Sequence, residues 1–275
     1  MIIPILTTDA GRCLTVANWQ EVGVQLVCYQ LTSLLMKPGL DFLIELSDFS
    51  AYTGWPGAFV LNASMPKIDD AGGYTLRSSY DGSRCRYTMN TLFKLISRLN
   101  PPFVVLPQGA NQQNPSAWLS LPSGVFPFFS PMDMPSRAAT RPYGIHLHYD
   151  GITAFSSLLK QISEYDEYIC YVSGELNAPQ LQTLAQMGMP YLESDMPSRD
   201  ACQGTVYHHN KIYSLQDEAQ AFQLDPIDPV CHCPTCSQKL TRAYLHHLLE
   251  HTPLLCQRFL IQHNIYYSQT SFTPG

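Results

Sequence analysis

The chain has 275 residues, which is enough for one large domain with a sizeable core or for a barrel with a small appendage. Hydrophobic residues make up 45% and charged residues 14%, a composition typical of a soluble globular protein, and no apolar run approaches the roughly 18 residues of a membrane span. The formal net charge of −6 argues against a surface that is basic throughout, the usual mark of nucleic-acid binding.

Cysteine usage and the first residues indicate the compartment. The nine cysteines include a dense cluster at metal-binding spacing, which fits a reducing environment better than a disulfide framework. The chain does not open on the basic and then apolar pattern of a secretory signal. We therefore expect a cytoplasmic protein without membrane association. Arg84 with Arg86 and Lys239 with Arg242 leave room for a local basic patch, although scattered solvated charges explain them equally well.

Short apolar, β-branched runs recur along the first two hundred residues and predict strands. These runs are Ile2–Leu6, Val24–Cys28, Ala58–Leu61, Phe103–Leu106, Gly144–Leu147, Tyr168–Val172 and Tyr191–Glu193. Helix-like stretches lie between several of them, at Met89–Leu99, Thr153–Tyr165 and Pro179–Met187. Alternating strands and helices predict a parallel sheet, and seven or eight such units predict an α/β fold of the (β/α)8 TIM-barrel type. The segment from 108 to 142 is rich in proline and serine, so we expect it to be irregular.

Three cysteines, Cys231, Cys233 and Cys236, fall within one tight turn that Pro234 stiffens. Zinc favours four nitrogen or sulfur donors in a tetrahedron, at about 2.0–2.3 Å from the metal. A fourth donor must come from elsewhere, and four histidines lie downstream, at His246, His247, His251 and His263. The alternative is a group of ordinary reduced cysteines beside a helical hairpin.

The segment after the cysteines predicts two helices. Leu240, Tyr244 and Leu248 recur at helical spacing, and Thr252 followed by proline resembles an N-cap that opens a second helix ending near His263. Such a hairpin would bring its far end back to the thiols. We therefore predict a structural Zn²⁺ site formed by Cys231, Cys233, Cys236 and His263, within a zinc-binding subdomain over residues 226–275 that follows a barrel over residues 1–225.

These residues resemble the zinc signature of the tRNA-guanine transglycosylase family. The resemblance rests on Cys231-x-Cys233-x2-Cys236, on the run from Thr241 to Leu248 and on His263-Asn264. It continues through several shorter segments, which are Leu34–Gly39, Gly54–Gly57, Gly73–Gly82, Pro197–Arg199 and Asp225-Pro226. The family exchanges a guanine in tRNA for queuine or a 7-deazaguanine precursor, on a (β/α)8 barrel with a zinc-binding insertion near its C-terminus. The resemblance thus implies the same fold and the same four metal ligands.

The resemblance also points to a nucleophile. In the family, an aspartate four residues before the proline of a Pro-Thr-Arg motif attacks the anomeric carbon. Counting back from Pro197 leads to Glu193, a carboxylate one methylene longer. Asp195 lies two residues on and would share the same side of the strand if the strand continues, forming a carboxylate pair. The alternative is that Glu193 and Asp195 simply begin a polar loop.

Other positions depart from the family pattern. The family's acid/base aspartate falls on Asn62, which cannot transfer a proton at neutral pH. The run that holds the base falls on 144–149, where the glutamine is missing and His146 and His148 are new, although a lone strand histidine is more often a core or rim residue. Arg199 keeps the first arginine after the motif proline. Asn62, His146 and Arg199 are therefore the candidates for substrate binding.

Two functions follow from this pattern. The first is a divergent transglycosylase, linked to queuosine formation, that acts on tRNA or a 7-deazaguanine nucleoside with Glu193 as nucleophile. The second is a non-catalytic relative that binds a base or acts as a partner subunit. Because family members pair with one another, the resemblance also implies a homodimer, or a heterodimer with an active family member.

Overall fold

The computed structural model describes residues 1–66, 68–69, 72–78, 80–208 and 211–272. Eight strands form one sheet in the order β1 (Ile2–Ile3), β10 (Tyr191–Glu193), β9 (Cys170–Gly174), β8 (Gly144–Tyr149), β7 (Phe126–Phe129), β6 (Phe103–Val105), β3 (Ala58–Asn62) and β2 (Leu26–Gln30). This is the strand order of a nearly closed (β/α)8 barrel, and it confirms the predicted fold class.

The chain divides into two compact units, each described by itself below. One comprises Met1–Gln25 with Gly174–Gly275, and the other comprises Leu26–Ser173. The predicted boundary between residues 225 and 226 stays a prediction.

The Leu26–Ser173 unit holds β2, β3, β6, β7, β8 and most of β9; its parallel pairings include β2–β3, β3–β6, β6–β7 and β7–β8, and β9 lies next to β8 in the sheet. Their central residues, such as Val27, Val60 and Val104, are fully buried. In such a barrel, helices cover the outer face and the strands' own side chains fill the interior, so the strands are apolar along their whole length instead of alternating with polar residues. This property made most of the strands recognisable from the sequence.

The remaining elements of this unit are short. Helix α5 spans Met89–Leu99, as predicted, and begins where the Thr88 hydroxyl accepts a hydrogen bond from the Thr91 amide. Strands β4 (Gly73–Arg77) and β5 (Arg84–Thr88) form an antiparallel hairpin. The other helices are α2 (Leu31–Leu34), η2 (Leu35–Gly39), α3 (Leu40–Glu45), α4 (Phe49–Thr53), α6 (Ala110–Gln113), α7 (Pro115–Leu119), η3 (Pro131–Asp133) and α8 (Phe155–Glu164).

The expectation that residues 108–142 are irregular was wrong, because this segment contains β7. Proline lacks an amide hydrogen and rarely occupies a central strand, so Pro127 argued against one. The hydrogen bonds between β7 and the β6 segment do not require an amide hydrogen on Pro127. The Phe126 amide donates to the Pro102 carbonyl at 2.8 Å, and the Phe128 carbonyl accepts from the Leu106 amide at 3.0 Å. Pairing with β8 starts only at Phe128, beyond the proline.

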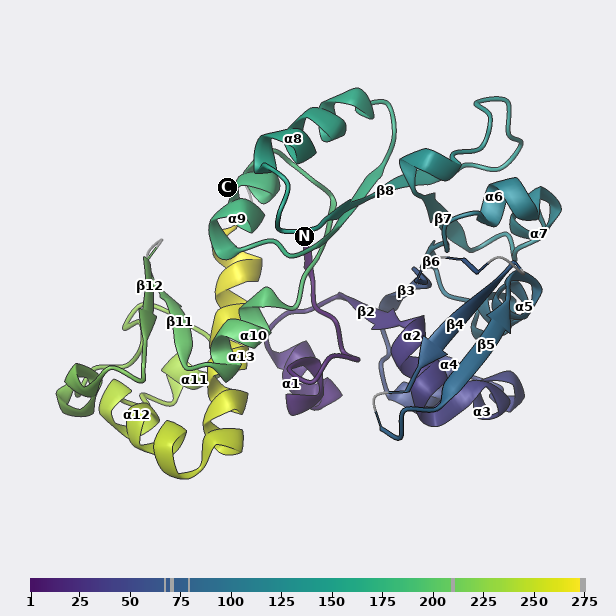
Figure 1. Ribbon diagram of the computed structural model, residues 1–275. Coiled ribbons are helices and arrows are strands. Elements are labelled where there is room, and N and C mark those ends of the chain that lie inside the picture. The colour runs from purple at the N-terminus through teal and green to yellow at the C-terminus, as the bar shows by residue number, and fades with distance from the viewer. Residues whose placement is uncertain (67, 70–71, 79, 209–210, 273–275) are drawn as a thin grey trace. The chain divides into compact units, whose positions relative to one another are not determined.

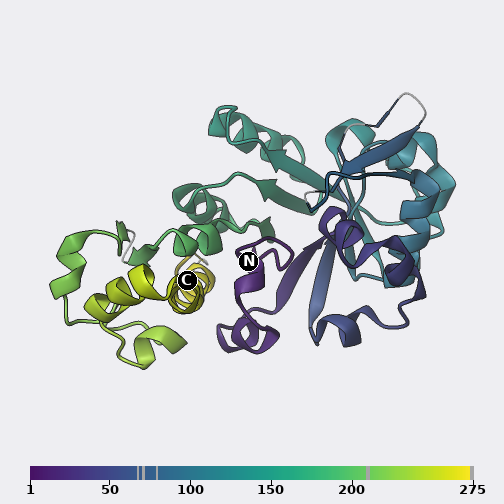
Figure 2. The same cartoon turned by 60° about the horizontal axis from the view of Figure 1, so that its bottom comes forward.

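The other unit contains β1 and β10, which pair in parallel, and the whole C-terminal region. Its remaining elements are η1 (Gly11–Cys13), α1 (Val16–Glu21), α9 (Ala178–Gln186), α10 (Met196–Cys202), β11 (Thr205–His208), β12 (Lys211–Ser214), η4 (Glu218–Phe222), α11 (Pro234–Ser237), α12 (Arg242–His251) and α13 (Pro253–Ser271). Helices α12 and α13 form the predicted hairpin and lie side by side in Figures 1 and 2.

Helix α13 is longer than predicted. It continues to Ser271, so the expectation that it ends near His263 was wrong. Ile265 and Tyr267, beyond that point, are both buried, and their packing carries the helix onward. Within the described part of the chain, no helix combines the length and the hydropathy needed to cross a bilayer.

Candidate metal centre and active site

The four predicted metal ligands converge in the structure. Cys231, Cys233, Cys236 and His263 bring their ligand atoms within 4.8 Å of one another. The His263 Nδ1 atom lies 3.4 Å from the Cys233 sulfur, 3.4 Å from the Cys236 sulfur and 3.9 Å from the Cys231 sulfur. A tetrahedral zinc ion with ordinary bond lengths separates sulfur from nitrogen by about 3.6 Å. The donor set and its spacing therefore fit a tetrahedral metal ion.

The backbone of the cysteine turn places the sulfurs. Helix α11 begins with Pro234 at its first position, and Cys233 caps it by accepting the Cys236 amide at 3.3 Å. The Cys233 amide in turn donates to the Cys231 sulfur at 3.4 Å. Hydrogen bonding with Cys231 and Cys236 lowers the pKa of Cys233 to about 4, while hydrogen bonding with Cys231 and Cys233 raises the pKa of Cys236. Sulfurs this close compete to hold negative charge, and a bound cation removes that competition.

The imidazole of His263 is oriented by a hydrogen bond from its other ring nitrogen. His263 is fully buried, and its Nε2 atom lies 2.8 Å from the Tyr207 carbonyl oxygen. A carbonyl only accepts, so Nε2 carries the hydrogen and Nδ1 presents its lone pair to the sulfurs. His246 instead bonds the Leu215 carbonyl through Nδ1, and His247 and His251 lie against each other on the exposed side of α12.

The side chain of Asn264, the residue after His263, hydrogen-bonds to three backbone groups. Its side-chain amide donates to the Pro197 carbonyl at 3.1 Å and to the Thr205 carbonyl at 2.9 Å. Its oxygen accepts from the Tyr207 amide at 3.2 Å. The pair His263-Asn264 therefore joins the metal cluster, β11 and the start of α10.

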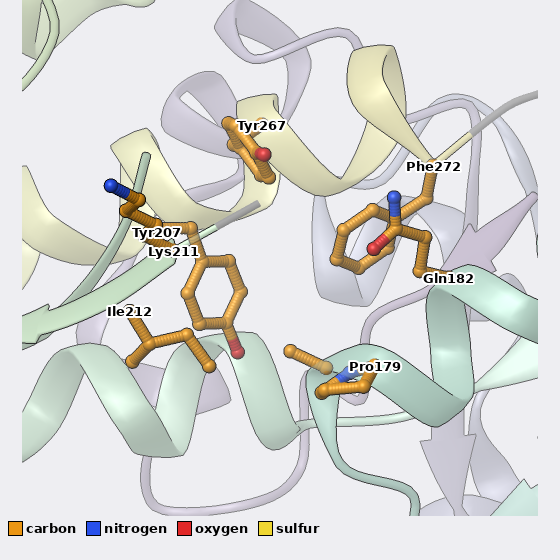
Figure 3. A pocket seen from close by; sticks show the side chains of 8 residues that line it. Pro179, Gln182, Tyr207, Lys211, Ile212, Tyr267 and Phe272 are labelled. Carbon is orange, nitrogen blue, oxygen red and sulfur yellow. The ribbon is translucent and has the colours of Figure 1, made fainter. Parts of the chain in front are cut away.

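Two hollows lie near this region. One, of about 380 Å³, borders Cys231 and His232, so the cluster approaches the surface at Cys231 while Cys233 and Cys236 are buried. The other, of about 30 Å³, has room for only one or two water molecules. Figure 3 shows the residues around the smaller one, where the Tyr207 and Phe272 rings stack with centroids 6.4 Å apart. Its size excludes a nucleotide or a base.

The candidate nucleophile lies at the end of a strand. Glu193 is the last residue of β10, is only 3% exposed and pairs in register with Ile3 of β1. The strand does not continue, because Asp195 already stands at the N-cap position of α10, with φ −99°, ψ 2° and no side-chain capping hydrogen bond. The alternation of side chains along a strand therefore does not extend to Asp195, and the two carboxylates are positioned by different elements.

Asp195 belongs to a group of charged side chains. The Arg199 guanidinium lies 3.1 Å from Asp195 and 2.6 Å from Glu175. Burial raises the pKa of Asp195, and the nearby arginine opposes that rise. Arg199, predicted to bind substrate, is thus already engaged with two carboxylates, and its side chain is 37% exposed.

The other two candidates belong to the Leu26–Ser173 unit. Asn62, at the end of β3, accepts a hydrogen bond from the Ser64 amide at 3.0 Å. His146, on β8, is buried, and its Nε2 atom lies 2.7 Å from the Ser173 hydroxyl. Burial, with a smaller contribution from His148, lowers the pKa of His146 to about 3. Ser173, which is 3% exposed, was not identified from the sequence as a partner of His146. The two residues are 27 positions apart, and no sequence pattern connects them.

Comparisons with known proteins agree with this architecture. The family model described as queuine tRNA-ribosyltransferase matches residues 155–273. A queuine tRNA-ribosyltransferase from Thermotoga neapolitana is 23% identical, over 96% of this chain and 83% of the relative. Those from Sorangium cellulosum and Granulibacter bethesdensis are 24% and 22% identical, over 96% and 98% of this chain and 77% and 82% of the relatives. Similarity at this level extends along nearly the whole chain.

Proposed function

We propose that this chain is a divergent member of the queuine tRNA-ribosyltransferase family and exchanges a base in tRNA or in a 7-deazaguanine nucleoside through an altered active site. The observation that supports this function is the buried carboxylate of Glu193 at the carboxyl end of β10. Barrel enzymes carry their reacting groups at the carboxyl ends of the strands.

In this proposal Glu193 acts as the nucleophile. Its carboxylate oxygen forms a bond to the anomeric carbon while the glycosidic bond breaks, and the bonding electron pair leaves with the departing base. Attack by the incoming base then releases the carboxylate. Asp195 is proposed to support this site, with Arg199 and Glu175 holding the segment that follows the nucleophile.

The metal of the four-ligand cluster is proposed to be zinc. Three thiolates and an imidazole are donors that zinc favours, and four protein ligands leave no open position for a reacting group. When bound, the ion supplies structural cross-linking and no chemistry. The residues themselves join α11 to α13, so the ion would fix the C-terminal region.

One observation favours a second function, that of a non-catalytic partner subunit. Asn62 stands where the family has an acid/base aspartate, and its amide oxygen is engaged by the Ser64 amide. A side-chain amide cannot donate or accept a proton at neutral pH. In this case the chain would bind a base or tRNA and pair with an active family member, as a heterodimer, or with itself.

The test is exchange of radiolabelled guanine into unmodified tRNA, with and without an active family member. Exchange by this protein alone, lost in Glu193→Gln, would support the base-exchange enzyme. Altered exchange only when the active relative is present would support the partner subunit. Wild-type exchange by Glu193→Gln would remove the nucleophile from the proposal, and no effect in either format would contradict both functions.

A further inference from the structure

Two cysteines from distant parts of the sequence meet within the unit formed by Met1–Gln25 and Gly174–Gly275. Cys13 is the last residue of η1, and Cys202 is the last residue of α10. Helix α13 contacts both elements, and Figure 1 shows α10 lying beside it. Both thiols are reduced and half-buried. The fold therefore places two solvent-accessible thiols on one side of the same helix pair.

One side chain of α13 contacts both cysteine residues. The Cys13 sulfur lies 4.0 Å from Gln257 Oε1, and Gln257 Nε2 donates to the Cys202 carbonyl at 3.2 Å. The two thiols also hydrogen-bond to each other. A disulfide bond is about 2 Å long, so thiols already in contact need only a short further approach to form one.

The other cysteines of this unit are placed differently. The three cysteines of the metal cluster converge with His263 on a shared site. Cys256 is fully buried, and its thiol donates to the Leu245 carbonyl at 3.2 Å. A dissolved oxidant must reach a sulfur from solvent, so Cys256 is protected from it. Cys13 and Cys202 combine access to solvent with a second thiol in contact.

The surroundings of the two thiols give them different roles. Burial raises the pKa of Cys202 to about 12, with further contributions from the Cys13 thiol and the Asp195 carboxylate. The Cys202 thiol therefore keeps its proton at neutral pH. Because the thiolate is the attacking species in disulfide exchange, the first attack falls to Cys13 and the second to Cys202.

We propose that Cys13 and Cys202 are a modification site, at which a low-molecular-weight disulfide such as oxidised glutathione converts the two thiols into a reversible intramolecular disulfide. The Cys13 sulfur attacks one sulfur of glutathione disulfide, whose S–S bond breaks, and the departing glutathione takes up the proton that Cys13 has lost. The Cys202 sulfur then attacks the Cys13 sulfur, and the second glutathione leaves with the Cys202 proton. Two protein thiols are oxidised, and one glutathione disulfide is reduced to two thiols.

The new bond would fasten η1 to the C-terminal end of α10. A disulfide between residues far apart in the sequence restricts the unfolded chain, so it stabilises the folded one. The same helix carries Arg199, which pairs with Asp195. The inference goes beyond the proposed base exchange and does not depend on it, because it concerns only the thiols and the segments that they join.

The first measurement identifies the bond. The full-length protein is incubated with oxidised glutathione, free thiols are alkylated, and peptides are analysed by mass spectrometry without reduction. We expect a peptide pair that links Cys13 to Cys202, and dithiothreitol should restore both thiols. Cys202→Ser should lose the link and carry glutathione on Cys13. Cys85→Ser removes another half-buried cysteine, on β5, and as the matched control should keep the link.

Two results of this measurement would overturn the inference. One is alkylation of both Cys13 and Cys202 after the incubation, and the other is glutathione on either residue with no peptide link between them. The second measurement is thermal unfolding. The linked wild type should unfold about 5 °C or more above the reduced protein, and Cys202→Ser should show no such rise. Equal Tm values for linked and reduced wild type would contradict the fastening of η1 to α10.

Discussion

At Glu193, one methylene separates this chain from the aspartate of the family motif. A displacement of a reacting group by about 1 Å can cost about a hundredfold in rate. The longer side chain is buried at the end of β10, where the surrounding backbone limits the directions in which it can point. Reactivity at this residue therefore depends on whether the strand end compensates for the added length.

Replacement of Glu193 tests this role directly. Glu193→Gln should eliminate a covalent adduct between protein and tRNA on denaturing gels, because an amide is a poor nucleophile. Glu193→Asp, which restores the family residue, should retain the adduct. Glu164→Gln changes an exposed carboxylate on α8 and serves as the control. An adduct of undiminished intensity in Glu193→Gln would move the nucleophile to another residue.

His146 makes the stability of the protein depend on pH. Its pKa in the folded protein is about 3, whereas an unfolded histidine titrates near 6.5. Below pH 6.5 the unfolded chain therefore binds more protons than the folded one, and stability is lost as the pH falls from 6.5 towards 3. Between pH 7 and pH 5 we expect the free energy of unfolding to fall by about 2 kcal/mol from this residue.

Chemical denaturation at several pH values measures this loss. His146→Gln should remove about 2 kcal/mol of the pH 7 to pH 5 difference, whatever its effect on stability at pH 7. His251→Gln, at an exposed histidine, should leave the difference unchanged. Asp195 has the opposite effect, because its raised pKa makes stability decrease with rising pH. The pH dependence of His146→Gln is therefore compared with that of the wild type, since both proteins contain Asp195. Equal pH dependence in wild type and His146→Gln would contradict the assignment.

Among the elements, α10, β11 and α13 are joined through Asn264. This fully buried side chain hydrogen-bonds to Pro197, Thr205 and Tyr207, so it pairs two carbonyls and one amide that are otherwise shielded from water. Leaving such groups unpaired costs about 1–3 kcal/mol each. The packing of three elements thus depends on one amide.

Asn264→Ala should accordingly lower the free energy of unfolding by about 3 kcal/mol. Ser268→Ala is the matched control in the same helix, because Ser268 is equally buried and its hydroxyl donates to the Asn264 carbonyl of its own helix. Its cost should be about 1 kcal/mol. Urea denaturation, with unchanged m-values, measures the loss of unfolding free energy in both variants. Equal losses would contradict an added stabilisation from the contacts of Asn264 with three elements.

The elements that the sequence predicted well are those specified by local pattern. The bounds of α5 and β10 follow from an apolar helical pattern and a short apolar run, and the convergence of the four metal-ligand candidates follows from cysteine spacing together with the predicted helical hairpin. Strand β7 was missed because a proline normally excludes a central strand, and the bonding pattern that tolerates Pro127 depends on β6 and β8.

The rest of the site depends on contacts between residues far apart in the chain. The side of the backbone on which Asp195 lies was uncertain because it depends on where β10 ends. Asp195 pairs with Arg199, which also pairs with Glu175, a residue 24 positions before Arg199 in the chain. Ser173 meets two histidines only because β8 and β9 are neighbours. Local periodicity contains no information of this kind.

At the scale of the whole molecule, we expect a metal ion bound by the four-residue cluster to contribute folding energy. Purified protein should carry one equivalent of zinc, and a strong chelator should lower its Tm, since ligand groups that converge in the folded state are dispersed in the unfolded one. Cys233→Ala should yield misfolded or metal-free material. Cys256→Ala removes another buried cysteine, outside the cluster, and should retain the metal. Full stability of metal-free wild-type protein would contradict the structural role.

The adjacency of His263 and Asn264 couples metal supply to a distant part of the same unit. The residue that closes the cluster is covalently joined to the one that anchors Pro197, which follows the Glu193–Asp195 segment by two residues. A chain that matures without its ion would therefore lose the restraint on α10 as well as the shape of its cysteine turn. With zinc as the proposed ion, any reaction at Glu193 is expected to depend on the zinc supply.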